Sequence, residues 1–497
     1  MTNAQSMQAI LPVITLLITG MVVLLGDAFL PFWRRSGVAS GSLSLLGIVI
    51  AAGFALDRLS HQPTHSLAFH GALSLGRFTQ ACTLLLLLLA GLAVLLAVTY
   101  LENRRLNRGE YYTLVLFATS GAILMAAAND LIVLFIAVEM LSVALYVLAG
   151  FARSEPRSEE AALKYFLLGA FAAGFLLYGI ALIYGGAAIS GLGGTTNLAL
   201  LHLRQGSVPG FMTVAGLALV LVGLGFKAAL VPFHMWAPDV YEGSPTSVTG
   251  FMAVVVKVGA FAALMRLFIA FAPAAAYWLP AIQIIAVLTM VTGNLLAVTQ
   301  TNVKRMLAYS SVAHAGYLLI AVAAAATPAA QPLALQAMVF YLAAYGLMTL
   351  GAFAVLAWLS HRDADCQTLS DLRGLVRTDP AAAWLMVIFM LSLGGIPPTM
   401  GFIGKWYLFT AALQSHQLWL AITLALVSMV AVFYYLRVVW TLCFEEGSGI
   451  SVSRNTLAPA GVQISLYVAA LLSLLGGIAP IVWQPLMLAA RSLGRMP

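Results

Sequence analysis

Residues 225–236 read Gly-Phe-Lys-Ala-Ala-Leu-Val-Pro-Phe-His-Met-Trp, which places Lys227 and Pro232 inside a long apolar run. Proline removes a backbone donor and clashes with the preceding turn, so we expect the helix to break at this point. Broken helices at membrane depth are tolerated where their free carbonyls line a polar cavity or an ion pathway. A second segment, Gly395-Ile-Pro-Pro-Thr-Met-Gly-Phe-Ile-Gly-Lys405, combines two prolines with a lysine in the same way. A plain packing kink is the alternative at both places.

The composition around these segments is that of a membrane protein. Of 497 residues, 62% are hydrophobic and 8% are charged, against roughly 25% charged in a soluble domain. The mean hydropathy is +0.99. Soluble, disordered, collagenous and disulfide-scaffold classes are therefore excluded. The net charge of +7 comes from scattered residues, so we expect no nucleic-acid partner. The expected fold is an all-α polytopic membrane protein in contact with the lipid bilayer.

The number of membrane crossings follows from the length of the apolar runs. A spanning helix needs about 20 mostly apolar residues, and the chain contains about fourteen such runs. Continuous rather than alternating apolar runs exclude a β-barrel. The expected spans are 8–29, 40–57, 78–101, 112–128, 131–151, 161–184, 211–236, 246–271, 278–299, 306–326, 333–360, 381–414, 417–444 and 460–488.

Basic residues in the connecting segments predict the orientation. Segments after odd-numbered runs hold roughly twice as many basic residues as those after even-numbered runs, with Lys304 assigned to the first group and Arg266 to the second. Basic residues are retained on the cytoplasmic side. We therefore expect a multi-pass protein of the bacterial inner membrane with both termini on the periplasmic side.

The lysines are distributed in a way that topology does not explain. The chain has five, and only Lys304 is assigned to a connecting segment. Burial can remove the proton of a lysine, whereas an arginine effectively keeps its charge. A charge at mid-bilayer costs roughly 2.5–3.5 kcal/mol, so chance placement is improbable. The pattern predicts chemistry that needs a switchable charge. The four lysines inside apolar runs are Lys164, Lys227, Lys257 and Lys405.

Other polar residues inside or beside the runs have either functional or structural explanations. Glu139 is the one acidic residue deep inside a run, and a mid-membrane carboxylate is functional by default. Asp27 and Asp130 stand at run ends, where we expect caps or interfacial contacts. Arg437 is expected to anchor at the cytoplasmic surface, and Lys164 is close enough to the interface to extend towards it. Buried histidines can relay protons, but simple hydrogen bonding is equally expected for His234 and His314.

Cofactor and metal signatures are missing from the sequence. The three cysteines are far apart, and the loop histidines His61, His65 and His70 have no acid or cysteine to complete a cluster. No complete Walker A or dinucleotide-binding motif is present. We expect this chain to bind no cofactor and no metal.

The order of features suggests an internal repeat within a single membrane domain, 1–497. Residues 112–271 and 278–444 each hold five runs, and the fourth run of each set carries proline and lysine together. An odd number of helices per copy inverts the second copy, and paired broken helices in inverted repeats are typical of secondary transporters. Three helices in 1–111 and one in 445–497 flank the repeats.

Several motifs resemble a known family. The strings Lys227-Ala-Ala-Leu-Val-Pro-Phe-His-Met-Trp-Ala-Pro-Asp239 and Asn302-Val-Lys-Arg-Met-Leu-Ala-Tyr-Ser-Ser311 resemble the antiporter-like subunits of proton-pumping respiratory NADH–quinone oxidoreductase (complex I). Val240-Tyr-Glu-Gly-Ser-Pro-Thr-Ser-Val-Thr-Gly250 is similar to the subunit N branch, which includes mitochondrial subunit 2. The resemblance covers essentially the whole chain. It implies a proton-translocating subunit without a redox centre, which works with other membrane subunits while NADH oxidation and quinone reduction occur elsewhere.

The resemblance also implies roles for individual residues. By motif position, Glu139 corresponds to the glutamate of the fifth helix and Lys227 to the lysine of the broken seventh. Lys257 matches the eighth-helix lysine, and Lys405 matches the ionisable residue of the broken twelfth. The secondary candidates are Lys164, His234 and His314. A subunit of a Mrp-type sodium/proton antiporter or of a membrane-bound hydrogenase is the alternative, since these share the fold; a structural scaffold with static ion pairs is a third hypothesis.

Overall fold

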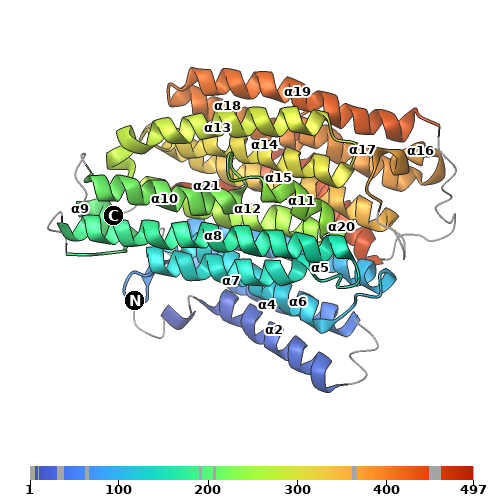
Figure 1. The fold of residues 1–497 in the computed structure, drawn as a ribbon, viewed down its shortest axis with the longest axis horizontal. Coiled ribbons are helices and arrows are strands. Elements are labelled where there is room, and N and C mark those ends of the chain that lie inside the picture. Colours follow the sequence, from blue (N-terminus) through green and yellow to red (C-terminus); the bar gives the residue numbers. More distant parts are fainter. Residues whose placement is uncertain are drawn as a thin grey trace.

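The computed structural model describes residues 6–8, 10–30, 38–61, 66–189, 193–204, 209–360, 366–446 and 460–495. Within these ranges the chain is a bundle of long, roughly parallel and antiparallel helices (Figure 1). One two-residue hairpin, β1 (Leu67–Ala68) with β2 (Leu73–Ser74), closes one end of the bundle. The fold is all-α and polytopic, as predicted.

The helices of the first half begin and end close to the expected runs. They are α2 (Leu11–Phe29), α4 (Val38–His61), α5 (Arg77–Asn103), α6 (Gly109–Ala127), α7 (Leu131–Ala149), α8 (Pro156–Ala187), α9 (Leu198–Arg204), α10 (Phe211–Ala228), α11 (Trp236–Gly243) and α12 (Thr246–Ala270).

The second half continues in the same manner, with short 3₁₀ segments between some helices. Its helices are α13 (Ala275–Val298), α14 (Val303–Ala324), α15 (Gln331–Leu359), α16 (Leu375–Thr378), α17 (Pro380–Gly394), α18 (Met400–Gln414), α19 (Leu418–Cys443), α20 (Ala460–Ile478) and α21 (Gln484–Ala490). The 3₁₀ segments are η2 (Ala272–Ala274), η3 (Leu369–Leu372), η4 (Pro480–Trp483) and η5 (Arg491–Arg495).

Thirteen helices in the described part of the chain are long and apolar enough to cross a membrane. The expected run 381–414 is the exception, because it contains α17 and α18, of 15 residues each. Neither reaches the length of about 20 residues that a bilayer requires, so the two helices would cross together rather than singly.

Both proline segments separate two helices. α10 ends at Ala228, and Ala229 adopts a left-handed conformation with φ +59° before α11 begins at Trp236. α17 ends at Gly394, and Gly395 has φ +79°, a conformation that glycine adopts without a steric penalty. The bonds Val231–Pro232 and Pro397–Pro398 are cis. In both places, the last carbonyls of the first helix have no N–H partner within that helix.

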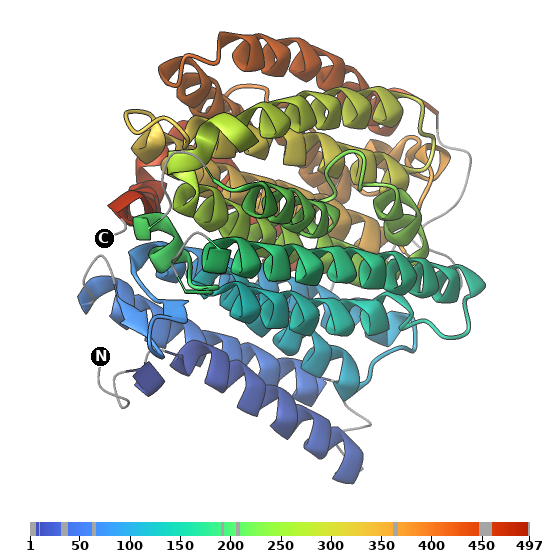
Figure 2. The ribbon, with the colours of Figure 1, turned by 60° about the vertical axis from the view of Figure 1, so that its left-hand side comes forward.

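Burial places the centre of the bundle on three helices. α12 and α15 are buried along their whole apolar window, and α14 nearly so. α2 and α4 lie at one edge of the bundle and α19 at the opposite edge (Figures 1 and 2). Near the end of the chain, α20 returns to pack against α5 and α15. The predicted site residues Lys257 and His314 therefore lie on the central helices α12 and α14.

Two assignments of basic residues to connecting segments are wrong. Lys304 is in the first turn of α14, fully buried, and donates to the Ser244 carbonyl over 2.7 Å. Arg266 is inside α12 and 1% exposed. Backbone carbonyls accept hydrogen bonds from both side chains, which compensates for the loss of water. The expected cap is confirmed at Asp130, whose carboxylate accepts from two backbone N–H groups at the start of α7.

Candidate functional site

Lys227 lies in the last turn of α10 inside a cage of aromatic rings. Its side chain is 3% exposed, and Nζ donates to the Tyr146 hydroxyl over 3.3 Å. Nζ is also 4.9 Å from the centre of the Tyr146 ring, 5.0 Å from that of Tyr165 and 5.6 Å from that of Phe226. Ring faces attract a cation, so the cage accommodates the ammonium without a bound carboxylate.

Glu139 is on α7, two turns before Tyr146 and on the same helix face. Its Oε1 is buried and has no hydrogen-bond partner in the described structure. The carboxylate interacts electrostatically with Lys227, yet no ion pair joins these two described residues. The structure therefore brings the predicted acid and base into the same region while the lysine binds a tyrosine.

Lys257 reaches from the central helix α12 to the end of α10. It is 2% exposed, and Nζ donates to the carbonyl oxygen of Ala228 over 3.2 Å. That carbonyl is available because α10 stops at this residue. On its other side, Nζ is 5.5 Å from the centre of the Tyr345 ring.

Lys405 on α18 folds back over the preceding helix end in the second proline segment. It is 8% exposed, and Nζ donates to the carbonyls of Leu393 (3.3 Å) and Gly394 (2.8 Å), the last two residues of α17. The ring centre of Tyr317 is 5.5 Å away. Lys257 and Lys405 thus have the same kind of environment, a helix C-terminus and a tyrosine ring.

His314 on α14 lies between these two lysines. Its Nδ1 is 2.7 Å from the Tyr341 hydroxyl and its Nε2 is 3.1 Å from the Tyr435 hydroxyl. Its ring centre is 5.1 Å from that of Tyr345, which Lys257 faces, and 5.3 Å from that of Tyr317, which Lys405 faces. The imidazole is therefore bonded on both nitrogens and in contact with both lysine-facing rings.

Two secondary candidates, His234 and Lys164, do not belong to the series Lys257, His314 and Lys405. His234 is in the turn between α10 and α11, and its Nδ1 is buried without a hydrogen-bond partner. Lys164 on α8 is 42% exposed at the side chain and pairs with Glu160 (2.7 Å) and Asp239 (2.9 Å). Its extension towards the interface is consistent with these contacts, and its amine belongs to a separate charged cluster.

That cluster was not predicted from the sequence. Asp239 on α11 accepts from Lys164 on α8 and from Arg305 on α14, the latter over 2.8 Å. Arg305 also pairs with Glu242 over 2.9 Å. Burial alone would raise the pKa of the Asp239 carboxyl, but the hydrogen bonds from the two cations outweigh it and lower that pKa below its usual value. A polar pocket of about 210 Å³ opens over these side chains.

The tyrosine hydroxyls around His314 were also missed. Tyr341 and Tyr345 are four residues apart on α15, so they face the same side of that helix. The Tyr345 hydroxyl donates to Ser311 over 2.8 Å, and Ser310 bonds to Tyr435. The spacing of hydroxyl residues three or four positions apart in an apolar run could have predicted this network, because a buried hydroxyl needs a hydrogen-bond partner. Among the described residues, no cluster of His, Cys, Asp or Glu could hold a metal ion.

The chain matches known proteins along its length. The family model described as NADH:quinone oxidoreductase/Mrp antiporter, TM, matches residues 128–431. A protein named NADH-quinone oxidoreductase subunit N from Trichlorobacter lovleyi is 43% identical, covering 96% of this chain and 95% of its own. A protein of the same name from Chloroflexus aggregans is 42% identical, with 94% of both chains covered.

Solved structures of similar shape come from several membrane complexes. A chain of respiratory complex I from Thermus thermophilus with bound aureothin is 35% identical, with a TM-score of 0.78, over 96% of this chain and 99% of that one. A chain of the Mrp complex from Dietzia sp. has a TM-score of 0.81 at 22% identity, covering 100% and 98%. The latter similarity concerns the fold alone.

Proposed function

Because the chain belongs to the NADH:quinone oxidoreductase/Mrp antiporter family of membrane subunits, we propose that it is the proton-translocating subunit N of a NADH–quinone oxidoreductase. It would work among the other membrane subunits of that complex. NADH oxidation and quinone reduction would take place in those other subunits, and this chain would hold no redox centre. The Mrp-type antiporter alternative is less well supported, since the two relatives described above, at 43% and 42% identity, bear the name of subunit N.

The observation that carries this proposal is the environment of three buried lysines. Lys227, Lys257 and Lys405 are each at most 8% exposed, and in the described structure none has a carboxylate within ion-pair distance. Their partners are a phenol hydroxyl or backbone carbonyls, which are neutral. A static scaffold would pair each cation with an acid. Lysines held by neutral partners can release and regain a proton at modest cost.

The mechanism that we propose begins at Lys227. A proton arrives from the cytoplasmic side, and the nearby carboxylate of Glu139 favours the charged ammonium. When Glu139 moves away or is neutralised, desolvation favours the neutral amine and the proton leaves. Neighbouring subunits would supply this change of charge or conformation.

The proton would then travel across the bundle rather than along one helix. Lys257, His314 and Lys405 follow one another through the rings of Tyr345 and Tyr317. Because both nitrogens of His314 are hydrogen-bonded to hydroxyls, the imidazole could accept a proton on one side and donate it on the other. From Lys405 the proton would leave outward.

We propose that the chain lies in a bacterial inner membrane with both of its termini on the periplasmic side. The excess of basic residues after odd-numbered spans supports this orientation. The positions of the N and C labels at the same end of the helices are consistent with it (Figure 1).

The test is proton pumping by the purified complex in vesicles, driven by NADH and a quinone. Lys227→Ala and Glu139→Ala should depress the proton-to-electron ratio. Arg58→Met is the control, because Arg58 is also a buried cation, 6% exposed, but lies on α4, away from the proposed proton path. Full pumping by both Lys227→Ala and Glu139→Ala would rule out the proposal.

A further inference from the structure

Arg266 closes one end of the first proposed repeat. It is near the end of α12, the fifth helix of that repeat, and it is 1% exposed. Nε donates over 2.6 Å to the carbonyl of Ala126, at the end of α6, the first helix of the same repeat. Nη2 donates to the Thr79 hydroxyl (2.6 Å) and the Ser74 carbonyl (3.2 Å). Nη1 is buried without a partner in the described structure.

Arg437 has the corresponding place in the second proposed repeat. It is near the end of α19, the fifth helix of that repeat. Nη1 donates over 2.9 Å to the carbonyl of Val298, the last residue of α13, and Nη2 donates over 2.5 Å to the Gln300 carbonyl just beyond. α13 is the first helix of the second repeat. Each arginine therefore joins the last helix of its repeat to the C-terminal end of the first.

The two arginines must lie at opposite ends of the bundle. In the order of crossings, α13 follows α6 by five, so the two helices run in opposite directions through the membrane. Arg266 is at the end where α6 stops and Arg437 at the end where α13 stops. In the proposed orientation these ends are extracytoplasmic and cytoplasmic, respectively.

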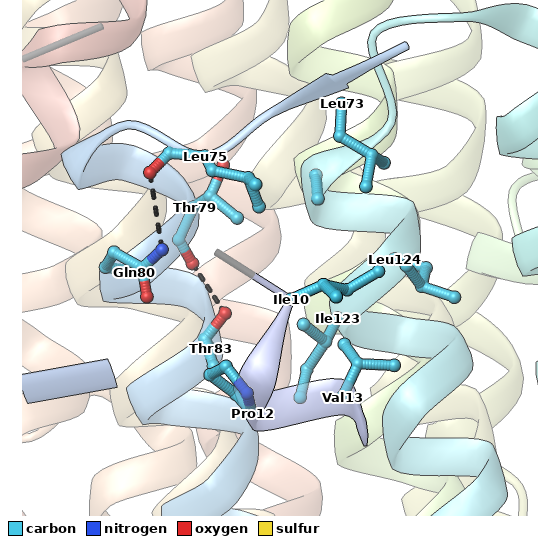
Figure 3. Close-up of a pocket in the computed structure, with 11 residues that line it drawn as sticks. Ile10, Pro12, Val13, Leu73, Leu75, Thr79, Gln80, Thr83, Ile123 and Leu124 are labelled. Atoms are coloured by element: carbon cyan, nitrogen blue, oxygen red, sulfur yellow. Dashed lines mark hydrogen bonds between the residues drawn. The ribbon is translucent and has the colours of Figure 1, made fainter. Parts of the chain in front are cut away.

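Two cavities of different size lie near opposite ends of the first repeat, the smaller one lined mainly by residues before that repeat. At the end of Lys164, Asp239 and Arg305, the polar pocket has about 210 Å³. Beside Thr79, at the end of Arg266, the cavity has about 10 Å³ and mainly apolar walls (Figure 3), which is the room that one water needs. In the second repeat, a cavity of about 320 Å³ reaches Lys405 between α18 and α19.

We propose that Arg266 and Arg437 are fixed cations that each seal one end of one repeat against protons. A guanidinium keeps its charge in proteins, and a fixed positive charge repels an arriving proton. Arg266 is fully buried, whereas Arg437 is partly exposed. Arg266 would block a direct exit from the first repeat, and Arg437 would block a direct entry into the second. A proton taken up by the first repeat must then cross to the second before it can leave. This inference rests on the proposed proton-translocating function.

The test measures passive proton flux through the resting complex. Vesicles that contain the purified complex receive a potassium diffusion potential without NADH, and an internal dye reports the change of pH. Arg266→Met and Arg437→Met should each raise the flux several-fold and lower the proton-to-electron ratio during turnover. Arg58→Met is the control: Arg58 is 6% exposed on α4, outside both repeats, and its replacement should leave the flux unchanged.

If the Arg266→Met and Arg437→Met complexes assemble and show the wild-type passive proton flux, the proposed sealing role is wrong. Lys227→Ala, measured in parallel, separates the two proposals. If Lys227→Ala loses pumping while the arginine variants keep the wild-type passive flux, only the seal is wrong. If Lys227→Ala and Glu139→Ala both pump fully, the proposed proton-translocating function itself is wrong.

A second variant covers the case in which methionine at position 266 prevents assembly. Arg266→Lys keeps a donor and a cation, but a buried amine loses its charge as pH rises. Passive flux should equal the wild-type value at pH 6 and exceed it several-fold at pH 9. Cys82 on α5 is the titratable side chain that the described structure places against Arg266, and the wild-type complex corrects for its titration. A flux in Arg266→Lys that does not change with pH would overturn the seal, because a merely structural tie predicts no such dependence.

Discussion

Lys257 and Ala228 are joined by a hydrogen bond of 3.2 Å between an ammonium on one helix and the terminal carbonyl of another. Lys405 binds Gly394 in the same way over 2.8 Å. A proline within each segment prevents the helix from using these carbonyls itself. The two helix ends therefore supply partial negative charge, worth about half an elementary charge each, without introducing an acid that would hold the proton permanently.

Lysine-to-arginine substitutions test whether these positions carry protons or only hold helix ends. Lys257→Arg and Lys405→Arg keep the positive charge and the ability to donate to the carbonyls. At pH 7 a guanidinium keeps its proton, whereas a buried lysine can release it. We expect assembled complexes with normal NADH oxidation and a reduced proton-to-electron ratio in vesicles. Normal pumping by both variants would show that neither lysine needs to release its proton.

The hydroxyl of Tyr146 provides a second test, with a control in the same cage. Tyr146→Phe removes the hydrogen bond to Lys227 and keeps the ring. A hydrogen bond to a charged group contributes about 1.5–3 kcal/mol, so proton retention at Lys227 should weaken by about tenfold or more and pumping should fall. Tyr165→Phe should have little effect, because the Tyr165 hydroxyl has no partner in the described structure. Equal pumping by Tyr146→Phe and Tyr165→Phe would show that the Tyr146 hydroxyl does not help Lys227 to retain its proton.

Close packing of helix pairs predicts where stability is most sensitive. A Cβ at Gly121 on α6 would lie 2.7 Å from the Leu141 nitrogen on α7, and one at Gly293 on α13 would lie 2.5 Å from the Ala313 nitrogen on α14. Gly121→Ala and Gly293→Ala should each destabilise the protein by about 1–3 kcal/mol through overpacking. Gly53→Ala meets no atom within 4 Å and should be neutral or slightly stabilising. Thermal unfolding in detergent measures all three, and an unchanged midpoint for Gly121→Ala and Gly293→Ala would refute the prediction.

Much of the fold was predictable because the bilayer imposes a simple constraint. Each crossing needs a long apolar helix, so runs of hydropathy located most of the membrane-spanning helices within a few residues. They did not locate the short helices α9, α11 and α16, and run 460–488 extends beyond the end of α20. The same reasoning misplaced Lys304 and Arg266. Hydropathy assigns an isolated charge to the nearest loop, whereas both side chains are inside helices and bind distant backbone carbonyls.

The candidate residues could be proposed from the sequence, but their contacts could not. Lysine at membrane depth is costly enough to be noticed in any single sequence, which is how Lys227, Lys257 and Lys405 were found. Their acceptors were not foreseeable, because a backbone carbonyl carries no sequence signal. The pairing of Asp239 with Lys164, 75 positions earlier in the chain, likewise depends on how α8 and α11 pack.

His314 provides the last test, because its two nitrogens contact two different hydroxyls. His314→Gln can still donate and accept hydrogen bonds, towards Tyr341 and Tyr435, but it cannot take up a proton. If the imidazole relays protons between Lys257 and Lys405, the variant should assemble, oxidise NADH normally and pump fewer protons per electron. If His314 only orders the tyrosines, glutamine should preserve both stability and pumping, whereas His314→Ala should lower the unfolding temperature. The proton-to-electron ratios of His314→Gln and His314→Ala are compared in the same vesicles. If His314 relays protons, both variants should lower the ratio to the same extent; if it only forms hydrogen bonds, His314→Gln should pump normally.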